Sequence, residues 1–169
     1  MNRYVILLRG INVGGNNIIK MSALKACLEQ AGFVDVSTYI ASGNVFVSSD
    51  EKAPAIVTRV EKLLAKTFAY DASVVVRSKA QMQATILKAP PGFGRQPAKF
   101  RYDCLFLKEP LTAAAALKSV TAKAGVDTVH AGPGALYFSR LVARITQTQL
   151  GKIVGTPIYK QMTIRNWNT

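Results

Sequence analysis

The order of strand-like and helix-like segments constrains this chain more than any other feature of its sequence. Residues 4–8 form a short run of aromatic and aliphatic side chains, which predicts a buried strand. After it come a helical pattern at 22–31, strand patterns at 35–40 and 44–48, a second helical pattern at 54–68 and a strand pattern at 73–77. This βαββαβ order predicts a ferredoxin-like unit of the α+β class with an antiparallel sheet.

Local signals indicate the ends and buried faces of the two helices. Ser22 is a residue type that caps helices, and Gly32 tolerates the left-handed backbone that ends them. Ile56, Val60 and Leu64 recur at helical spacing, so they predict the core face of the second helix.

The C-terminal half repeats much of this order. A short helix is expected at 79–88, a strand at 102–107, a helix at 112–124, strands at 127–130 and 135–139, and a short helix at 150–154. The Pro- and Gly-rich residues 89–97 predict a boundary. We therefore expect a first ferredoxin-like half over 1–78, a helix and basic linker over 79–101, and a second half over 102–169.

Similarity between the halves predicts an internal duplication. Tyr4 matches Tyr102 at an offset of 98, residues 23–25 match 116–118 at 93, and Gly43 matches Gly134 at 91. Because the offset falls from 98 to 93 between the first strand and the first helix, the first half carries an insertion there. Insertions on a scaffold often carry function.

The five extra residues lie within a glycine-rich loop, residues 10–20. A strand, such a loop and a helix start in succession can cradle an anion with backbone N–H groups. The loop also contains two apolar pairs, Ile11 with Val13 and Ile18 with Ile19. We expect both pairs to hold the loop against the core.

The charge is strongly basic. The chain has 22 Lys and Arg and 9 Asp and Glu, for a net charge of +13, of which +4 lies in residues 1–85 and +9 in 86–169. Such a surplus favours nucleic acids or small anions as partners, although a basic protein without such a partner fits equally well.

Cys27 and Cys104 have no second metal ligand at the spacing of a metal-binding motif. They are expected to be reduced core residues of a cytoplasmic protein. No signal peptide or membrane span is expected.

Signatures of catalysis and of metal binding are missing. The loop matches neither the dinucleotide fingerprint nor the P-loop, and no nucleophile elbow or zinc-protease motif occurs. The single histidine, His130, falls at the end of an expected strand. We expect no catalytic residue, no metal and no cofactor, while catalysis by a carboxylate stays open.

Aromatic residues give a weaker indication of RNA binding. Phe46 lies on a strand of the first half, and Tyr102, Phe106 and Tyr137 lie on strands of the second. Residues 42–47 match the RNA-binding consensus poorly. We therefore favour packing of these rings between the two sheets over stacking on RNA bases. In the linker, cationic residues alternate with aromatic rings. This pattern suits binding of single-stranded nucleic acid, but it fits a solvated linker equally well. The residues are Arg95, Lys99, Phe100 and Arg101. Trp167, the only tryptophan, predicts an anchor in a groove.

Several segments together resemble a bacterial family. They are Arg-Gly-Ile-Asn-Val-Gly-Gly at 9–15, Ile-Lys-Met at 19–21, Gly-Phe at 32–33, the segment 38–45 and Arg-Asn-Trp-Asn-Thr at 165–169. This pattern is similar to the family called domain of unknown function 1697, over essentially the whole chain. The resemblance implies a small cytoplasmic α+β protein with two ferredoxin-like halves, and it implies no activity. In similar proteins residues 165–169 open a final helix, which would be shortened or missing here.

Our leading hypothesis is a noncatalytic binding protein for an anionic ligand, either nucleic acid or a nucleotide. The expected contacts in the loop are Arg9, Gly10, Asn12, Gly14, Gly15, Asn16 and Lys20. The expected neighbours are Ser42, Gly43, Asn44, Arg165 and Asn166. One alternative is an enzyme acting on a small phosphorylated or carboxylated substrate at the same loop, and another is a protein-interaction module.

Overall fold

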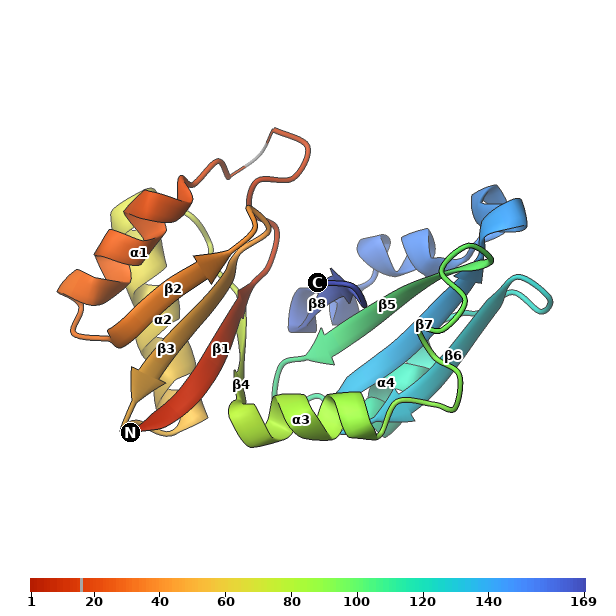
Figure 1. Cartoon of the computed structure of the whole chain (residues 1–169). Coiled ribbons are helices and arrows are strands. Elements are labelled where there is room, and N and C mark those ends of the chain that lie inside the picture. Colours follow the sequence, from red (N-terminus) through yellow and green to blue (C-terminus); the bar gives the residue numbers. More distant parts are fainter. Residues whose placement is uncertain (16) are drawn as a thin grey trace. The chain divides into compact units, whose positions relative to one another are not determined.

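The structure is a computed structural model that describes residues 1–15 and 17–169. The chain divides into two compact units, Met1–Met82 and Gln83–Thr169 (Figure 1). Each unit contains one four-stranded antiparallel sheet together with helices. The predicted mixture of helices and antiparallel sheets is confirmed.

The first unit has its strands and helices in the predicted order. They are β1 (Asn2–Leu8), α1 (Met21–Gln30), β2 (Val34–Tyr39), β3 (Asn44–Ser49), α2 (Ala53–Phe68) and β4 (Val74–Ser78). The strands lie in the order β2-β3-β1-β4 and all pairings are antiparallel. Helix α3 (Lys79–Leu87) begins in this unit.

The core of the first unit lies between the sheet and helices α1 and α2. Tyr4, Ile6 and Leu8 of β1 belong to it, because alternate residues of a strand face the same side. From the helices it includes Leu24, Leu28, Ile56, Val60 and Leu64. Each fully buried aliphatic side chain contributes about 1.5–3 kcal/mol. The core face predicted for α2 is confirmed.

The second unit has more irregular helices. Its elements are β5 (Phe100–Leu107), α4 (Ala113–Ser119), β6 (Asp127–Gly132), β7 (Ala135–Leu141), the 3-10 helices η1 (Val142–Gln147), η2 (Leu150–Gly155) and η3 (Pro157–Gln161), and β8 (Met162–Asn166). The strand order is β6-β7-β5-β8. The buried core includes Leu105, Leu107, Leu136, Phe138 and Met162.

The two sheets share one strand order, but the match of Tyr4 with Tyr102 is wrong by one residue. The N–H of Leu8 donates to Gly43 O (2.8 Å), and the N–H of Leu107 donates to Gly134 O (3.0 Å). These equivalent bonds align β1 with β5 at an offset of 99. A slip of one residue moves a strand's side chains to the other face. Tyr4 therefore faces its core, whereas Tyr102 faces away from the core face of its sheet.

The insertion in the first unit is longer than expected. Residues 9–20 connect β1 to α1, whereas only residues 108–112 connect β5 to α4. The first connection is therefore seven residues longer, two more than the sequence match indicates. One of the two additional residues comes from the strand offset, which is 99 and not 98. The other comes from the helix offset, which is 92 and not 93, because the buried Leu24 of α1 corresponds to the buried Ala116 of α4.

The start of α1 differs from the prediction, and its end agrees. Ser22 does not cap the helix: α1 begins at Met21, and Lys20 precedes it with extended backbone and no side-chain cap bond. Gly32 has a φ of +84° and its N–H donates to Glu29 O (2.9 Å). This left-handed glycine ends the helix as predicted.

Helix α4 ends at Ser119 and does not reach residue 124 as predicted. The next residue, Val120, has extended backbone and is buried. The carboxylate of Asp127 accepts hydrogen bonds from the N–H groups of Lys123 (3.0 Å) and Gln149 (2.8 Å). The bond to Lys123 holds the far end of residues 120–123 outside the helix, because the amide of Lys123 cannot also donate within α4.

The C-terminal segment contains a strand that the sequence analysis did not predict. Strand β8 pairs with β5 over five residues, from Asp103 opposite Asn166 to Leu107 opposite Met162. Arg165 and Asn166 therefore belong to a strand and do not open a helix.

Candidate functional site

The glycine-rich loop, residues 9–20, is anchored by one member of each apolar pair. Ile11 and Ile19 are buried (1% and 4% exposed), whereas Val13 and Ile18 are exposed (64% and 75%). Both buried side chains belong to the core between the sheet and α1. The prediction that both pairs hold the loop is thus half right, and the exposed members lie near its tip.

Asn12 closes the base of this loop. Its Nδ2 donates to Ile19 O (2.9 Å) and to Ala41 O (2.8 Å), and its Oδ1 accepts from the N–H of Ile19 (2.8 Å). The backbone N–H of Asn12 also donates to Asn17 O (3.2 Å). The side-chain amide is therefore used in holding the loop to the β2–β3 hairpin, and the backbone N–H is used within the loop.

Left-handed backbone recurs along the loop. Gly10, Asn12, Gly14, Gly15 and Asn17 all have positive φ. A Cβ on Gly10 or Gly15 would have no atom within 4 Å, so backbone conformation and not crowding favours glycine at these two positions. Asn16 lies outside the described residues.

The β2–β3 hairpin packs against the loop at Gly43. A Cβ on Gly43 would lie 2.8 Å from both Leu8 Cβ and Ile11 Cδ1, so only glycine fits there. Asn44 is buried, and its Nδ2 donates to Tyr39 O (3.0 Å) and Ser42 Oγ (3.1 Å). The structure therefore brings the expected neighbours Ser42, Gly43 and Asn44 beside the loop.

The charged side chains within the loop are all basic. Residues 9–28 contain no carboxylate, and the first turn of α1 has no acidic residue. Lys20 is exposed directly before α1, and Arg9 is half-buried at the end of β1. A helix start without a bound carboxylate keeps its positive end available to an anion.

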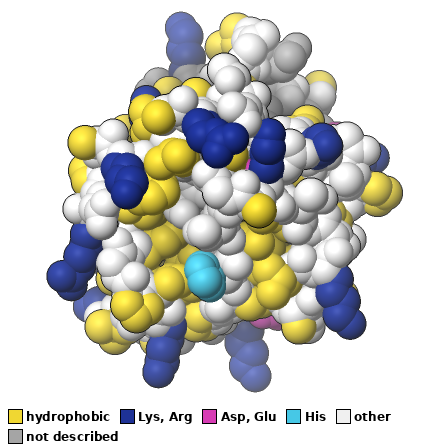
Figure 2. Space-filling model, turned by 90° about the vertical axis from the view of Figure 1, so that its right-hand side faces the viewer, with side chains coloured by type: hydrophobic (Ala, Val, Ile, Leu, Met, Phe, Trp, Pro, Cys, Tyr) yellow, Lys and Arg dark blue, Asp and Glu magenta, His cyan; other side chains and the backbone are white. Residues whose placement is uncertain are grey.

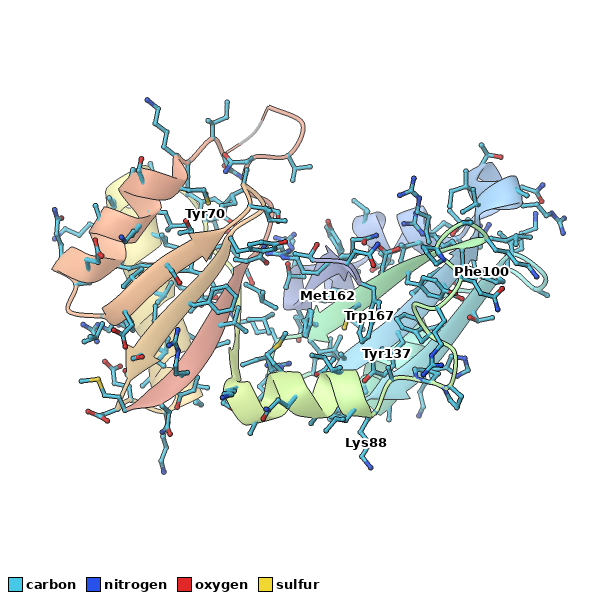
Figure 3. All side chains as sticks on the ribbon, viewed as in Figure 1. Tyr70, Lys88, Phe100, Tyr137, Met162 and Trp167 are labelled. Atoms are coloured by element: carbon cyan, nitrogen blue, oxygen red, sulfur yellow. The ribbon has the colours of Figure 1, made fainter. Side chains whose placement is uncertain are left out.

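Tyr70 supports the loop from the α2–β4 connection and was missed by the sequence analysis. Its hydroxyl donates to the carbonyl of Arg9, 61 residues away. Burial raises the pKa of Tyr70, and the positive charge of Arg9 opposes that rise. Tyr70, labelled in Figure 3, has no local sequence signal, because its contact depends on chain segments that only folding brings together.

The remaining residues expected at the site lie in the second unit. Arg165 is buried, and its Nη1 donates to Thr163 Oγ1 (2.8 Å) and Ile164 O (2.9 Å). Asn166 accepts from the N–H of Asn168 through its Oδ1 (3.0 Å). Both side chains therefore make contacts within the C-terminal segment.

The linker folds onto the sheet of the second unit through its aromatic side chains. Phe93 makes edge-to-face contacts with Tyr102 (4.9 Å between centroids), Tyr137 (5.4 Å) and Trp167 (5.1 Å), the last two labelled in Figure 3. A Cβ on Gly94 would lie 2.4 Å from Trp167 Nε1. These rings pack against one another, and Trp167 anchors the C-terminal segment as predicted.

The basic residues of the linker are exposed. Arg95, Lys99 and Arg101 project into solvent, and Lys99 Nζ lies 5.4 Å from the centre of the Phe100 ring. Figure 2 shows one face of the molecule, on which Lys and Arg are spread widely and do not gather into one patch. The arrangement allows contact with a polyanion, but it has no defined groove.

Metal-binding groups, disulfides and membrane-spanning helices are not found among the described residues. No group of three His, Cys, Asp or Glu in this part of the chain could hold a metal ion. Cys27 and Cys104 are both buried, and neither forms a disulfide. None of the described helices is long and apolar enough to cross a membrane.

Comparison with known proteins identifies the family. Residues 1–137 match DUF1697, which is described as a protein of unknown function. The chain belongs to this family. The chain is also similar to a solved structure, that of a conserved bacterial protein from Streptococcus pneumoniae, with a TM-score of 0.86 and 28% sequence identity. The match covers 99% of this chain and 93% of that protein. No curated protein matches the sequence.

Proposed function

We propose that this protein is a noncatalytic binding protein for an anionic ligand, a nucleotide or a nucleic acid, and that the glycine-rich loop makes the main contact. The observation that carries the proposal is the construction of the loop. Its base is held by Ile11, Asn12 and Ile19, while its tip is exposed. A loop whose base is fixed before binding loses less conformational entropy when the ligand arrives.

The charge of the loop selects an anion as the ligand. Lys20 and the start of α1 supply positive potential, and no carboxylate between residues 9 and 28 opposes it. The proposed contacts are Arg9, Gly10, Gly14, Gly15, Asn16 and Lys20, with Ser42, Gly43 and Asn44 beside them and Asn12 holding the loop. Arg165 and Asn166 are retained as candidates from the second unit.

A nucleic acid would make further contacts through the linker. Arg95, Lys99 and Arg101 are exposed, and Phe100 is partly exposed beside Lys99. Alternating cations and rings suit a single strand, because the cations bind phosphates and the rings stack on bases. The net charge of +13 would favour such binding over long range.

We also propose that the two units are ferredoxin-like and arose by duplication. Support comes from their common strand order and from the equivalent hydrogen bonds of Leu8 and Leu107. A cytoplasmic location is proposed as well, because the two buried cysteines do not form a disulfide.

The test compares two variants that remove the same charge. Lys20→Gln removes the cation at the loop, and Lys62→Gln removes an exposed cation from α2. Fluorescence anisotropy with short single-stranded RNA and DNA, and thermal shift with nucleoside phosphates, are measured at low and near-physiological salt. We expect Lys20→Gln to weaken binding about 3- to 10-fold and to lower the slope of log K against log salt by about one. Lys62→Gln should change neither value.

Three results would contradict the proposal. One is a lack of binding to every nucleotide and oligonucleotide at low salt. Another is equal weakening by both variants, which would indicate bulk charge and no defined site. The third is product formation from a phosphorylated ligand, which would show that the protein is an enzyme.

A further inference from the structure

A groove of about 350 Å³ lies on the first unit, away from the glycine-rich loop. It is lined by Arg3, Tyr4, Val5, Phe46, Lys79 and Met82, which come from β1, β3 and the start of α3 (Figure 1). Binding sites for small ligands have volumes of about 300–1,000 Å³ and are mostly apolar with a few polar groups. This groove is at the lower end of that range.

The floor of the groove is formed by the Phe46 ring and the Val5 side chain on the sheet. Val5 of β1 lies directly opposite Phe46 of β3 in the antiparallel pairing, so both side chains are on one face. That face is opposite the one covered by α1 and α2, because Tyr4 and Val47, one position away on each strand, belong to the core. Phe46 remains 38% exposed, although it is a large apolar ring.

Two cations border this floor. Arg3 is on the same face of β1 as Val5, and Lys79 is the first residue of α3. Both are exposed, and among the described residues neither forms an ion pair. No residue that lines the groove is acidic. Asp35 of β2 is an acidic residue outside the groove lining, and its carboxylate accepts a hydrogen bond from Ser48 Oγ of β3 (2.8 Å).

We propose that this groove binds a nucleotide. The base would stack on Phe46 above Val5 and Met82, and the phosphate would lie between Arg3 and Lys79. Aromatic rings on a sheet stack bases, and paired cations bind phosphate through charge-assisted hydrogen bonds. The nucleotide can be free in solution or part of a single strand, since both present the same base and phosphate.

This site is independent of the proposed contact at the glycine-rich loop. Arg3 and Arg9 lie at opposite ends of β1, and six residues of extended strand span roughly 20 Å. A ligand the size of one nucleotide cannot reach both. For a mononucleotide, Lys20→Gln and the groove variants therefore test the two sites separately.

The experiment is isothermal titration calorimetry of the full chain with AMP, GMP, CMP and UMP, with inorganic phosphate, and with short single-stranded RNA. The variants are Phe46→Leu, Phe46→Trp, and Arg3→Gln combined with Lys79→Gln. The matched control is Lys62→Gln combined with Lys66→Gln, which removes two exposed cations from α2. Thermal melting of each variant verifies that it is folded.

We expect saturable binding of at least one nucleotide. Phe46→Leu should weaken it about tenfold because stacking is lost, whereas Phe46→Trp should retain it. The double variant of Arg3 and Lys79 should weaken it at least tenfold, and the control should leave it within about twofold. Binding of RNA but of no mononucleotide would assign the site to single strands, and the reverse would assign it to free nucleotides.

Several results would overturn the proposal. Inorganic phosphate binding as tightly as a nucleotide would exclude a role for the ring. Binding that survives unchanged in the Arg3 and Lys79 double variant, or that is lost only in Lys20→Gln, would show that the nucleotide does not occupy this groove. The absence of saturable heat with every ligand would do the same.

Discussion

The side chain of Asn12 pairs with the backbone of Ile19 in the way that one peptide group pairs with another in a sheet. Its Nδ2 donates to Ile19 O (2.9 Å) and its Oδ1 accepts from Ile19 N–H (2.8 Å). The same Nδ2 also donates to Ala41 O (2.8 Å). A single amide thus joins both ends of the glycine-rich loop to the neighbouring hairpin.

Asn12→Gly should destabilise the protein by about 1–3 kcal/mol, because three hydrogen bonds are lost. Glycine suits the positive φ at this position (53°), so the change adds no backbone strain. Urea denaturation gives the free energy of unfolding, and hydrogen exchange at the Ile19 amide reports the local effect. The matched control is Asn17→Gly, which has a similar φ (48°) and removes one exposed bond to Gly10 O. Equal losses for the two variants would show that Asn12 does not hold the loop.

Gly94→Ala should cost more stability than Gly92→Ala. Both glycines have left-handed backbone, with φ of +81° and +79°, which costs an alanine about 1–2 kcal/mol. A Cβ at position 94 would also lie 2.4 Å from Trp167 Nε1, whereas a Cβ at position 92 would have nothing within 4 Å. We expect a further loss of about 1–3 kcal/mol for Gly94→Ala. Thermal denaturation measures the loss, and a change in Trp167 emission, absent in Gly92→Ala, should accompany it.

Tyr137 should make stability fall at alkaline pH. Burial raises its pKa to about 12, and the charge of Cys104 adds to the effect. An unfolded chain loses this proton near pH 10, so between about pH 10 and pH 12 the unfolded state binds fewer protons and stability falls as pH rises. Tyr137→Phe should show a smaller fall over this range.

Absorbance of tyrosinate near 295 nm checks the same assignment without unfolding the protein. The wild type should contain one more late-titrating tyrosine than Tyr137→Phe. At neutral pH this variant should lose about 1 kcal/mol, because the hydroxyl of Tyr137 donates to Thr85 O (2.6 Å). Identical stability profiles for the two proteins between pH 10 and pH 12 would contradict the raised pKa.

Arg59→Lys should destabilise the first unit by about 1–2 kcal/mol although it keeps the charge. The guanidinium bonds to the Glu51 carboxylate and to Ala31 O, and it lies 4.4 Å from the centre of the Phe33 ring. A lysine ammonium cannot make all three contacts at once. Urea denaturation measures the loss. The converse substitution Lys62→Arg, at an exposed position of the same helix, should change stability by less than about 0.5 kcal/mol.

Most elements of the first unit could be predicted, because their signals are local. The periodicity of residues 54–68 and the position of Gly32 depend only on neighbouring residues, and α2 and the end of α1 agree with them. Predictions were less reliable in the second unit. Residues 120–123 lie outside the helix, and the N–H of Lys123 donates to Asp127 instead; no pattern in those residues shows this.

The candidate site was predictable only in its composition. Glycines and asparagines at 10–17 indicated left-handed backbone, which the described residues of the loop have. Their roles were not predictable. The sequence does not show that Asn12 is used for holding the loop, or that Tyr70 bonds to Arg9 across 61 residues.

By itself, the sequence determined the order of strands and helices in the first unit, the buried face of α2, the charge and the family, since all of these depend on residue types and their spacing. Only the tertiary structure decided the alignment of β1 with β5, the pairing of β8 with β5 and the groove beside Phe46. Each of these depends on hydrogen bonds or packing between distant segments. A shift of one residue, which changes the local sequence pattern very little, moves Tyr102 to the opposite face from Tyr4.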